Sequence, residues 1–121
     1  MRILFCDDHA LLRKLIALSM RGTGHEFWVA GSGAQAIEIA RQVRPEVLVT
    51  DIAMPGMDGF ELVARLRAEP ELEGMRVVFT TASADMNEAG AGMMPFVQLP
   101  KPFGPAELRA LLDSLELSSL A

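Results

Sequence analysis

The chain has 121 residues and a formal net charge of −5, from 11 basic and 16 acidic side chains. Half of its residues are hydrophobic, which excludes a disordered chain and suits one domain of ordinary size, residues 1–121. The acidic excess argues against nonspecific nucleic-acid binding, and against binding to anionic membranes, as the main activity.

No segment has the composition of a membrane anchor or a signal peptide. The apolar runs fall short of the roughly 20 residues that a spanning helix needs, and Asp7-Asp8 interrupts the apolar start of the chain too early for a signal peptide. Cys6 is the only cysteine, so no internal disulfide can form, and its place in an apolar run predicts a small core residue. We therefore expect a cytoplasmic protein with no membrane insertion.

Strand and helix patterns alternate through the first half of the chain. Ile3–Cys6 and Phe27–Ala30 are short apolar runs, typical of buried strands. Between them, Ala10–Met20 has the periodicity of a helix. Ala34–Val43 is the next predicted helix, and Ser32 is placed to cap it. The predicted inward face of the first helix holds Leu11, Leu12, Leu15, Ile16 and Ser19.

The same alternation continues through the second half. Val47–Thr50 is an apolar, β-branched run that suits a central strand buried on both faces. Phe60–Ala68 is the next predicted helix, and Val77–Phe79 and Phe96–Leu99 are further strands. From Pro105 onward, leucines spaced i, i+3, i+4, i+7 predict a final amphipathic helix.

Residues 83–95 give the weakest pattern. Ala84–Ala89 favours a helix, but two glycines and a proline follow and argue against a long one. The stretch Asp85–Met94 contains three methionines, whose unbranched side chains adapt to varied surfaces. It is interpreted either as a mobile partner-binding face or as a poor helix whose methionines fill gaps in the core.

The alternation of strand and helix, five times over, predicts the α/β fold class. Such alternation implies a five-stranded parallel sheet with helices on both faces. Among the possible strand orders we expect 2-1-3-4-5, a flavodoxin-like (βα)5 arrangement. The chain has no short repeat, linker or low-complexity tract, so one domain accounts for the whole sequence.

Polar residues follow four of the predicted strands: Asp7-Asp8, Asp51, Thr80-Thr81 and Lys101. If the first and third strands are neighbours, three carboxylates meet at the point where the strand order reverses. Adjacent anions raise one another's proton affinity, and Mg²⁺ removes that conflict because it prefers oxygen ligands. Such a cluster suits phosphoryl chemistry, in which the metal and a lysine neutralise charge while a carboxylate attacks in line.

Taken together, these motifs resemble the receiver domain of two-component response regulators, the chemotaxis-regulator-like family. The resemblance covers essentially the whole chain, and the motifs occur in the family's order and at family-like spacing. The matching segments are the Asp7-Asp8 pair, the D-I-A-M-P-G-M-D-G run from Asp51, Thr81-Ala82 and Lys101-Pro102-Phe103.

The resemblance implies a phosphoacceptor and a metal site. Asp51 would attack the phosphorus of a phosphohistidine on a histidine kinase or a histidine phosphotransfer protein. Asp8, Asp51 and the main-chain carbonyl of Ala53 would bind Mg²⁺, and Asp7 would hold a metal-bound water. The chain would then be a signalling domain that catalyses its own phosphorylation and dephosphorylation, and not an enzyme for a separate substrate.

The resemblance also implies a switch. Thr81 would hydrogen-bond the phosphoryl group, and Lys101 would pair with Asp51 at rest and with phosphoryl oxygens afterwards. Phosphorylation would bias the surface made by helix 4, strand 5 and helix 5 between two pre-existing states. The output would be an unidentified target protein, with no direct nucleic-acid contact, and the chain would be a monomer or a phosphorylation-dependent dimer.

Two features depart from the family pattern. Thr81 and Lys101 are closer in sequence than in the family, which removes length from helix 4, and the residue three positions before the lysine is not aromatic. The family has a Tyr or Phe three residues before the lysine, where this chain has Gln98; Phe96 is placed to share a face with Gln98 and is a candidate substitute. Ala53 and Ser83 stand where side chains control access of the hydrolytic water, and the small Ala53 favours a short phosphoryl lifetime.

Several alternatives remain open from the sequence. Each polar residue, taken alone, suits a capping, turn or surface role. A degenerate receiver that serves as a constitutive scaffold is a further alternative. A phosphatase of the haloacid-dehalogenase type would need a second Asp two residues after the first, where this chain has Ala53. A nucleotide- or flavin-binding module would need a fuller glycine motif than Gly31-Ser32-Gly33. His9 is interpreted as a helix-start residue near the cleft, and His25 as a surface residue. Because the last helix ends near Ala121, we expect a stand-alone receiver, with a domain cut from a larger regulator or hybrid kinase as the alternative.

Overall fold

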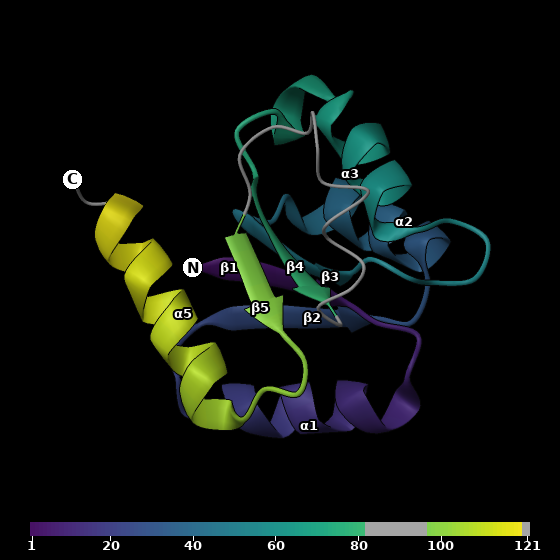
Figure 1. The fold of residues 1–121 in the computed structure, drawn as a ribbon. Coiled ribbons are helices and arrows are strands. Elements are labelled where there is room, and N and C mark those ends of the chain that lie inside the picture. The colour runs from purple at the N-terminus through teal and green to yellow at the C-terminus, as the bar shows by residue number, and fades with distance from the viewer. Residues whose placement is uncertain (82–96, 120–121) are drawn as a thin grey trace.

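The structure is a computed structural model that describes residues 1–81 and 97–119. Five parallel strands form one sheet in the order β2-β1-β3-β4-β5, which confirms the predicted fold class and strand order (Figure 1). The strands are β1 (Arg2–Cys6), β2 (Glu26–Ala30), β3 (Val47–Asp51), β4 (Arg76–Thr81) and β5 (Val97–Pro100).

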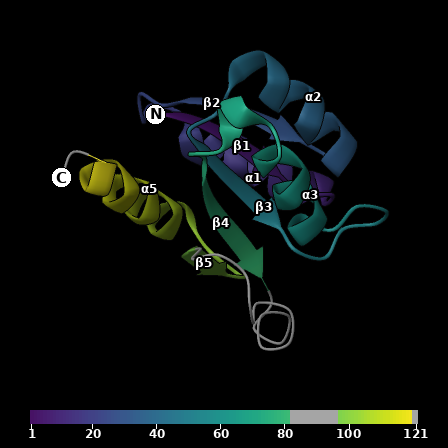
Figure 2. The same cartoon turned by 90° about the horizontal axis from the view of Figure 1, so that it is seen from above.

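Helices cover both faces of the sheet. α1 (Ala10–Met20) and α5 (Pro105–Ser119) pack on one face, and α2 (Gly33–Val43) and α3 (Gly59–Arg67) pack on the other (Figures 1 and 2). A short 3₁₀ turn, η1 (Pro70–Leu72), follows α3. None of the helices in these ranges is long and apolar enough to cross a membrane.

The two helical layers explain why the strands are apolar throughout. In β1, Ile3 and Phe5 pack in the core beneath α1 and α5, whereas Leu4 and Cys6 pack beneath α2 and α3. All four side chains are buried. Successive side chains point to opposite faces of a strand, so a strand covered on both faces must be apolar at every position.

Local signals set the helix boundaries. The Ser32 hydroxyl accepts a hydrogen bond from the Gln35 amide at 3.2 Å, which confirms that Ser32 caps α2. At the other end of α2, Arg44 adopts a left-handed conformation with φ 49° just before Pro45. In α3, Asp58 takes the capping role and accepts from the Glu61 amide at 2.8 Å.

Two strands, β3 and β4, extend further at their carboxyl ends than predicted. β3 includes Asp51 and β4 includes Thr81, because pairing continues to these polar residues: Asp51 is in register with Thr80, and Thr81 with Pro100. β5 is shifted by one residue from the prediction and ends at Pro100. The helix predicted at Ala84–Ala89 and the methionine-rich stretch lie outside the described residues.

Two predictions about exposure were wrong. In α1, Leu11 and Leu15 are at least half exposed, whereas Ile16, Ser19 and Met20 are buried. The helix carries more leucines than the stripe that meets the sheet can bury. His25 was interpreted as a surface residue, but its side chain is 7% exposed and Nδ1 lies 2.9 Å from the Met1 amine.

Candidate functional site

The carboxyl ends of β1 and β3 bring two buried carboxylates together. These strands are neighbours at the centre of the sheet, where the strand order reverses. Asp7 follows β1 and is 2% exposed, and Asp51 ends β3 and is 4% exposed. Two ionised carboxylates in such a place need compensation, because burial removes the water that would otherwise solvate them.

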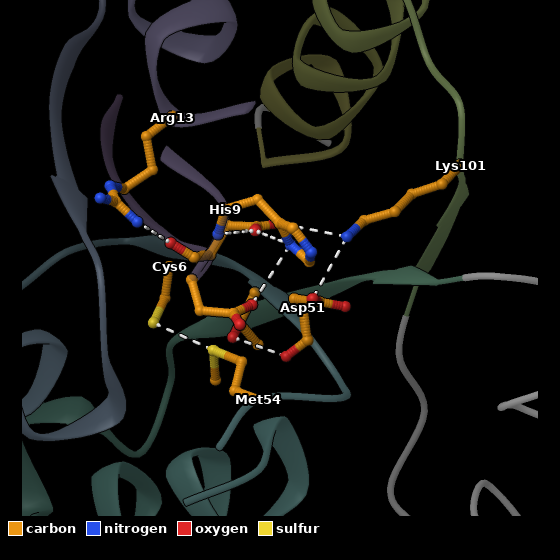
Figure 3. Close-up of polar contacts among 9 residues, drawn as sticks. Cys6, His9, Arg13, Asp51, Met54 and Lys101 are labelled. Carbon is orange, nitrogen blue, oxygen red and sulfur yellow. Dashed lines mark hydrogen bonds and ion pairs between the residues drawn. The ribbon is translucent and has the colours of Figure 1, made fainter. Parts of the chain in front are cut away.

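Lys101 provides part of that compensation from the loop after β5. Its ammonium Nζ lies 3.1 Å from Asp7 Oδ2 and 3.2 Å from Asp51 Oδ2 (Figure 3). The Lys101 main-chain amide also donates to the Thr81 carbonyl at 2.9 Å, which ties this loop to the end of β4. The lysine therefore bridges both acids and does not pair with Asp51 alone.

The charges in the cluster oppose one another. Burial raises the pKa of Asp51, and the nearby charge of Asp7 adds to this, while Lys101 counteracts both. Burial by itself would lower the pKa of Lys101, but its hydrogen bond to Asp7 and the charges of Asp7 and Asp51 outweigh it and raise the pKa. The lysine is thus held in its charged form, whereas the Asp51 carboxylate is destabilised in its ionised form.

One lysine does not balance the whole cluster. Asp7, Asp8, His9 and Asp51 each offer one ligand atom, and these atoms all lie within 4.8 Å of one another. Asp8 Oδ1 is buried and accepts no hydrogen bond from the part of the chain that the structure describes. Carboxylate oxygens at this spacing, one of them without a donor, fit a small divalent cation.

The His9 ring belongs to this cluster, whereas the sequence interpretation placed His9 near the cleft only as a helix-start residue. The His9 backbone is the residue before α1, as expected, but its side chain makes no capping hydrogen bond. Instead Nδ1 lies 3.0 Å from Asp7 Oδ1 and 3.3 Å from Asp8 Oδ1. The available signal was its position directly after two acids at the end of a strand.

Arg13 was missed by the sequence interpretation. Its Nη1 donates to the Asp7 main-chain carbonyl at 2.9 Å, and its guanidinium covers Gly31, where a Cβ would lie 3.2 Å from Cζ (Figure 3). Arg13 therefore fixes the loop that carries the acids against the end of β2. Its position six residues after Asp7 gave no hint of this contact.

The loop after β3 is held by a close approach of α3. The Gly59 amide donates to the Ile52 carbonyl at 2.8 Å, and a Cβ on Gly59 would collide with the Asp51 carbonyl oxygen. Ala53, two residues beyond Asp51, is exposed. A glycine at the start of α3 thus sets how closely this loop can fold back over the end of β3.

The remaining residues lie around this centre. Thr81 is buried at the end of β4, and Gln98, which stands at the family's aromatic position, is exposed. Cys6 is a buried core residue, as predicted; burial raises the pKa of its thiol to about 12, and Sγ lies 3.6 Å from Met54 Sδ. Phe96 and Ser83 lie outside the described residues.

The comparison with known families identifies this arrangement. The family model for the response regulator receiver domain matches residues 3–113. The chain belongs to this receiver family. That membership favours two-component signalling over the phosphatase and nucleotide-binding alternatives.

Sequence relatives are response regulators. The DNA-binding response regulator MtrA of Mycobacterium tuberculosis is 35% identical over 111 residues, which cover 90% of this chain and 47% of that protein. Response regulator MprA of Mycobacterium leprae is 33% identical over 117 residues, covering 95% of this chain and 50% of that protein. The chain therefore spans about half the length of the curated relatives it matches.

Solved structures of receivers superpose closely. The chemotaxis response regulator CheY4 of Vibrio cholerae gives a TM-score of 0.83 at 26% identity, covering 93% of this chain and 96% of that chain. The receiver domain of sensor histidine kinase PA1611 from Pseudomonas aeruginosa gives 0.80 at 26% identity, covering 93% and 94%. That structure contains a magnesium ion coordinated in its active-site cleft.

Proposed function

We propose that this chain accepts a phosphoryl group on Asp51 from a phosphohistidine and passes the signal to a protein partner. The donor is a histidine kinase or a histidine phosphotransfer protein in a cytoplasmic two-component or phosphorelay pathway. The observation that carries the proposal is the buried Asp51 carboxylate beside the Lys101 ammonium, at the end of a central strand and next to two further acids.

The transfer needs only groups that the site and the donor supply. An Asp51 carboxylate oxygen forms a bond to phosphorus while the P–N bond of the phosphohistidine breaks. The electron pair of that bond remains on the imidazole nitrogen of the donor. Because the other ring nitrogen of the phosphohistidine carries a proton, the donor leaves as neutral imidazole. Lys101, already 3.2 Å from Asp51, is placed to contact the negative phosphoryl oxygens as they arrive.

In this proposal Asp8, Asp51 and the Ala53 carbonyl would hold Mg²⁺, and Asp7 would hold a water beside it. The bound ion would supply positive charge for the equatorial phosphoryl oxygens. The donor set supports this assignment because it consists of oxygens, and because Asp8 Oδ1 is buried without a hydrogen-bond donor in the described ranges.

The output follows from what the new group would contact. We expect the Thr81 hydroxyl to hydrogen-bond the phosphoryl group and Lys101 to move its pairing from Asp7 and Asp51 to phosphoryl oxygens. Both residues are joined by the main-chain hydrogen bond between the end of β4 and the loop after β5. Phosphorylation would therefore act first on β5 and α5, where the partner would read it.

Intact mass after incubation with acetyl phosphate and Mg²⁺ tests the proposal. Wild-type protein should gain one phosphoryl group, and Asp51→Ala and a chelator-treated sample should gain none. Asp58→Asn is the matched control, because Asn caps a helix as well as Asp does and the residue lies in the same loop. It should be phosphorylated like the wild type.

Either of two results would contradict the proposal. One is a wild-type protein that binds Mg²⁺ but takes no phosphoryl group from acetyl phosphate or from any phosphohistidine protein. The other is a phosphoryl group that persists in Asp51→Ala. The exposed, small Ala53 also predicts rapid hydrolysis, so a half-life of many hours would contradict that part of the proposal.

A further inference from the structure

His9 gives the acidic cluster a nitrogen donor that an all-carboxylate site lacks. The two oxygens of Asp7 face different partners: Oδ2 meets the Lys101 ammonium, whereas Oδ1 meets the His9 amide at 2.9 Å and the His9 ring at 3.0 Å. The ring also lies 3.3 Å from Asp8 Oδ1 (Figure 3). His9 and Lys101 therefore contact different oxygens of the Asp7 carboxylate.

The spacing of these atoms is that of neighbouring ligands around one ion. Two ligands bound at right angles, each about 2.1 Å from a metal, are about 3.0 Å apart. The ring nitrogen has nearly this separation, 3.3 Å, from Asp8 Oδ1, which is a ligand in the proposed site, while its 3.0 Å contact with Asp7 Oδ1 is a hydrogen bond that holds the ring beside that ligand. Asp8 Oδ1 is also the buried oxygen that accepts no hydrogen bond from the described residues.

We propose that His9 is a nitrogen ligand of the divalent-cation site, so that the site selects Zn²⁺ over Mg²⁺ more strongly than its carboxylates alone would. Imidazole is a good ligand for Zn²⁺, whereas Mg²⁺ prefers oxygen and keeps several waters. The inference rests on the proposed function, since it concerns the same cation site. It adds a specificity-determining residue to that site.

The test measures the affinities of Zn²⁺ and Mg²⁺, each added alone, by calorimetry at constant pH. His9→Asn removes the imidazole but keeps a polar side chain at a position that is 66% exposed, so the fold should be retained. We expect this variant to lose about tenfold or more in Zn²⁺ affinity, the scale of losing one metal-supporting residue. Its Mg²⁺ affinity should stay within about twofold of the wild type.

His25→Asn is the matched control, because the chain has only two histidines. His25 precedes β2, at the amino ends of the parallel strands and so at the sheet edge opposite the site. Its replacement should leave the stronger Zn²⁺ binding unchanged. With Cu²⁺ as a spectroscopic probe, imidazole ¹⁴N modulation in pulsed electron paramagnetic resonance should be lost in His9→Asn and kept in His25→Asn.

Equal Zn²⁺ affinity in wild type and His9→Asn would overturn the inference, as would an equal loss of Zn²⁺ and Mg²⁺ affinity. Failure of the proposed function is distinguishable from both results. In that case wild-type protein would bind no Mg²⁺, or Asp51→Asn would bind it as tightly as wild type, and the inference would fall with the site.

Discussion

Gly59→Ala should destabilise the fold strongly, because α3 begins in direct contact with the end of β3. The added Cβ would overlap the Asp51 carbonyl oxygen and lie 3.0 Å from Ile52 Cα and 3.2 Å from the Asp51 carbonyl carbon. All three atoms belong to the main chain, so no side chain can rotate to make room. Either α3 or the loop after Asp51 must shift.

The cost follows from that constraint. Inserting a methyl group into a packed core typically costs 1–3 kcal/mol, and we expect about 3 kcal/mol here because only backbone can move. For a domain of this size, about 1 kcal/mol corresponds to roughly 4 °C in the melting temperature. The variant should therefore melt about 12 °C below the wild type.

Gly74→Ala is the control substitution. Gly74 is exposed, its φ is not positive, and nothing lies within 4 Å of the Cβ it would gain. Replacing a glycine at such a position usually stabilises by about 0.4–1 kcal/mol, because the unfolded chain loses freedom. Urea unfolding and thermal melts of both variants give the comparison. A Gly59→Ala variant within about 0.5 kcal/mol of Gly74→Ala would refute the close-approach argument.

Three further predictions concern the core and the site. Asp51→Asn should raise the melting temperature at pH 7, because the raised pKa of Asp51 means that its ionised form disfavours the folded state. The cost to the folded state appears as the pH rises from the unfolded pKa of Asp51, near 3.8, through its higher folded pKa. The stability gained by Asp51→Asn should therefore vanish in acid. A variant that melts below the wild type at pH 7 would contradict the reasoning. Phe79→Ala should cost about 3–5 kcal/mol in urea unfolding, since Phe79 is fully buried and its ring centroid lies 4.9 Å from that of Phe60; a loss below about 1 kcal/mol would show that the site collapses to fill the cavity. Cys6 should react with a disulfide reagent only as fast as the protein unfolds. With a thiol pKa of about 12, about one molecule in ten thousand is thiolate at pH 8, so rapid labelling of the native protein would be contrary to this account.

Local patterns determined the elements of this fold. β1 and β3 are continuous apolar runs because helices cover both faces of the sheet, and that requirement is visible in the sequence without any contact information. The Ser32 cap and Pro45 set the limits of α2 for equally local reasons, a hydroxyl acceptor and a restricted backbone. Strand order did not follow from these patterns, because alternation of strands and helices implies a parallel sheet but leaves several orders open; the order 2-1-3-4-5 was an added expectation, which the pairing of the strands confirms.

The contacts within the site were decided by the tertiary structure. Lys101 reaches Asp7 across 94 positions in sequence, and no local pattern specifies which of two neighbouring acids it meets. The same applies to the His9 ring, which turns toward the acids and leaves α1 without a side-chain cap. Whether Leu15 is buried depended on which stripe of α1 met the sheet.

The sequence by itself thus determined the strands, the helices and the set of polar residues at the carboxyl edge of the sheet, because each depends on neighbours along the chain. Only the tertiary structure decided the partners and distances of Lys101 and His9 and the close approach at Gly59. These depend on the relative placement of elements that are distant in the chain, and differences of about an ångström in that placement separate an ion pair from no contact.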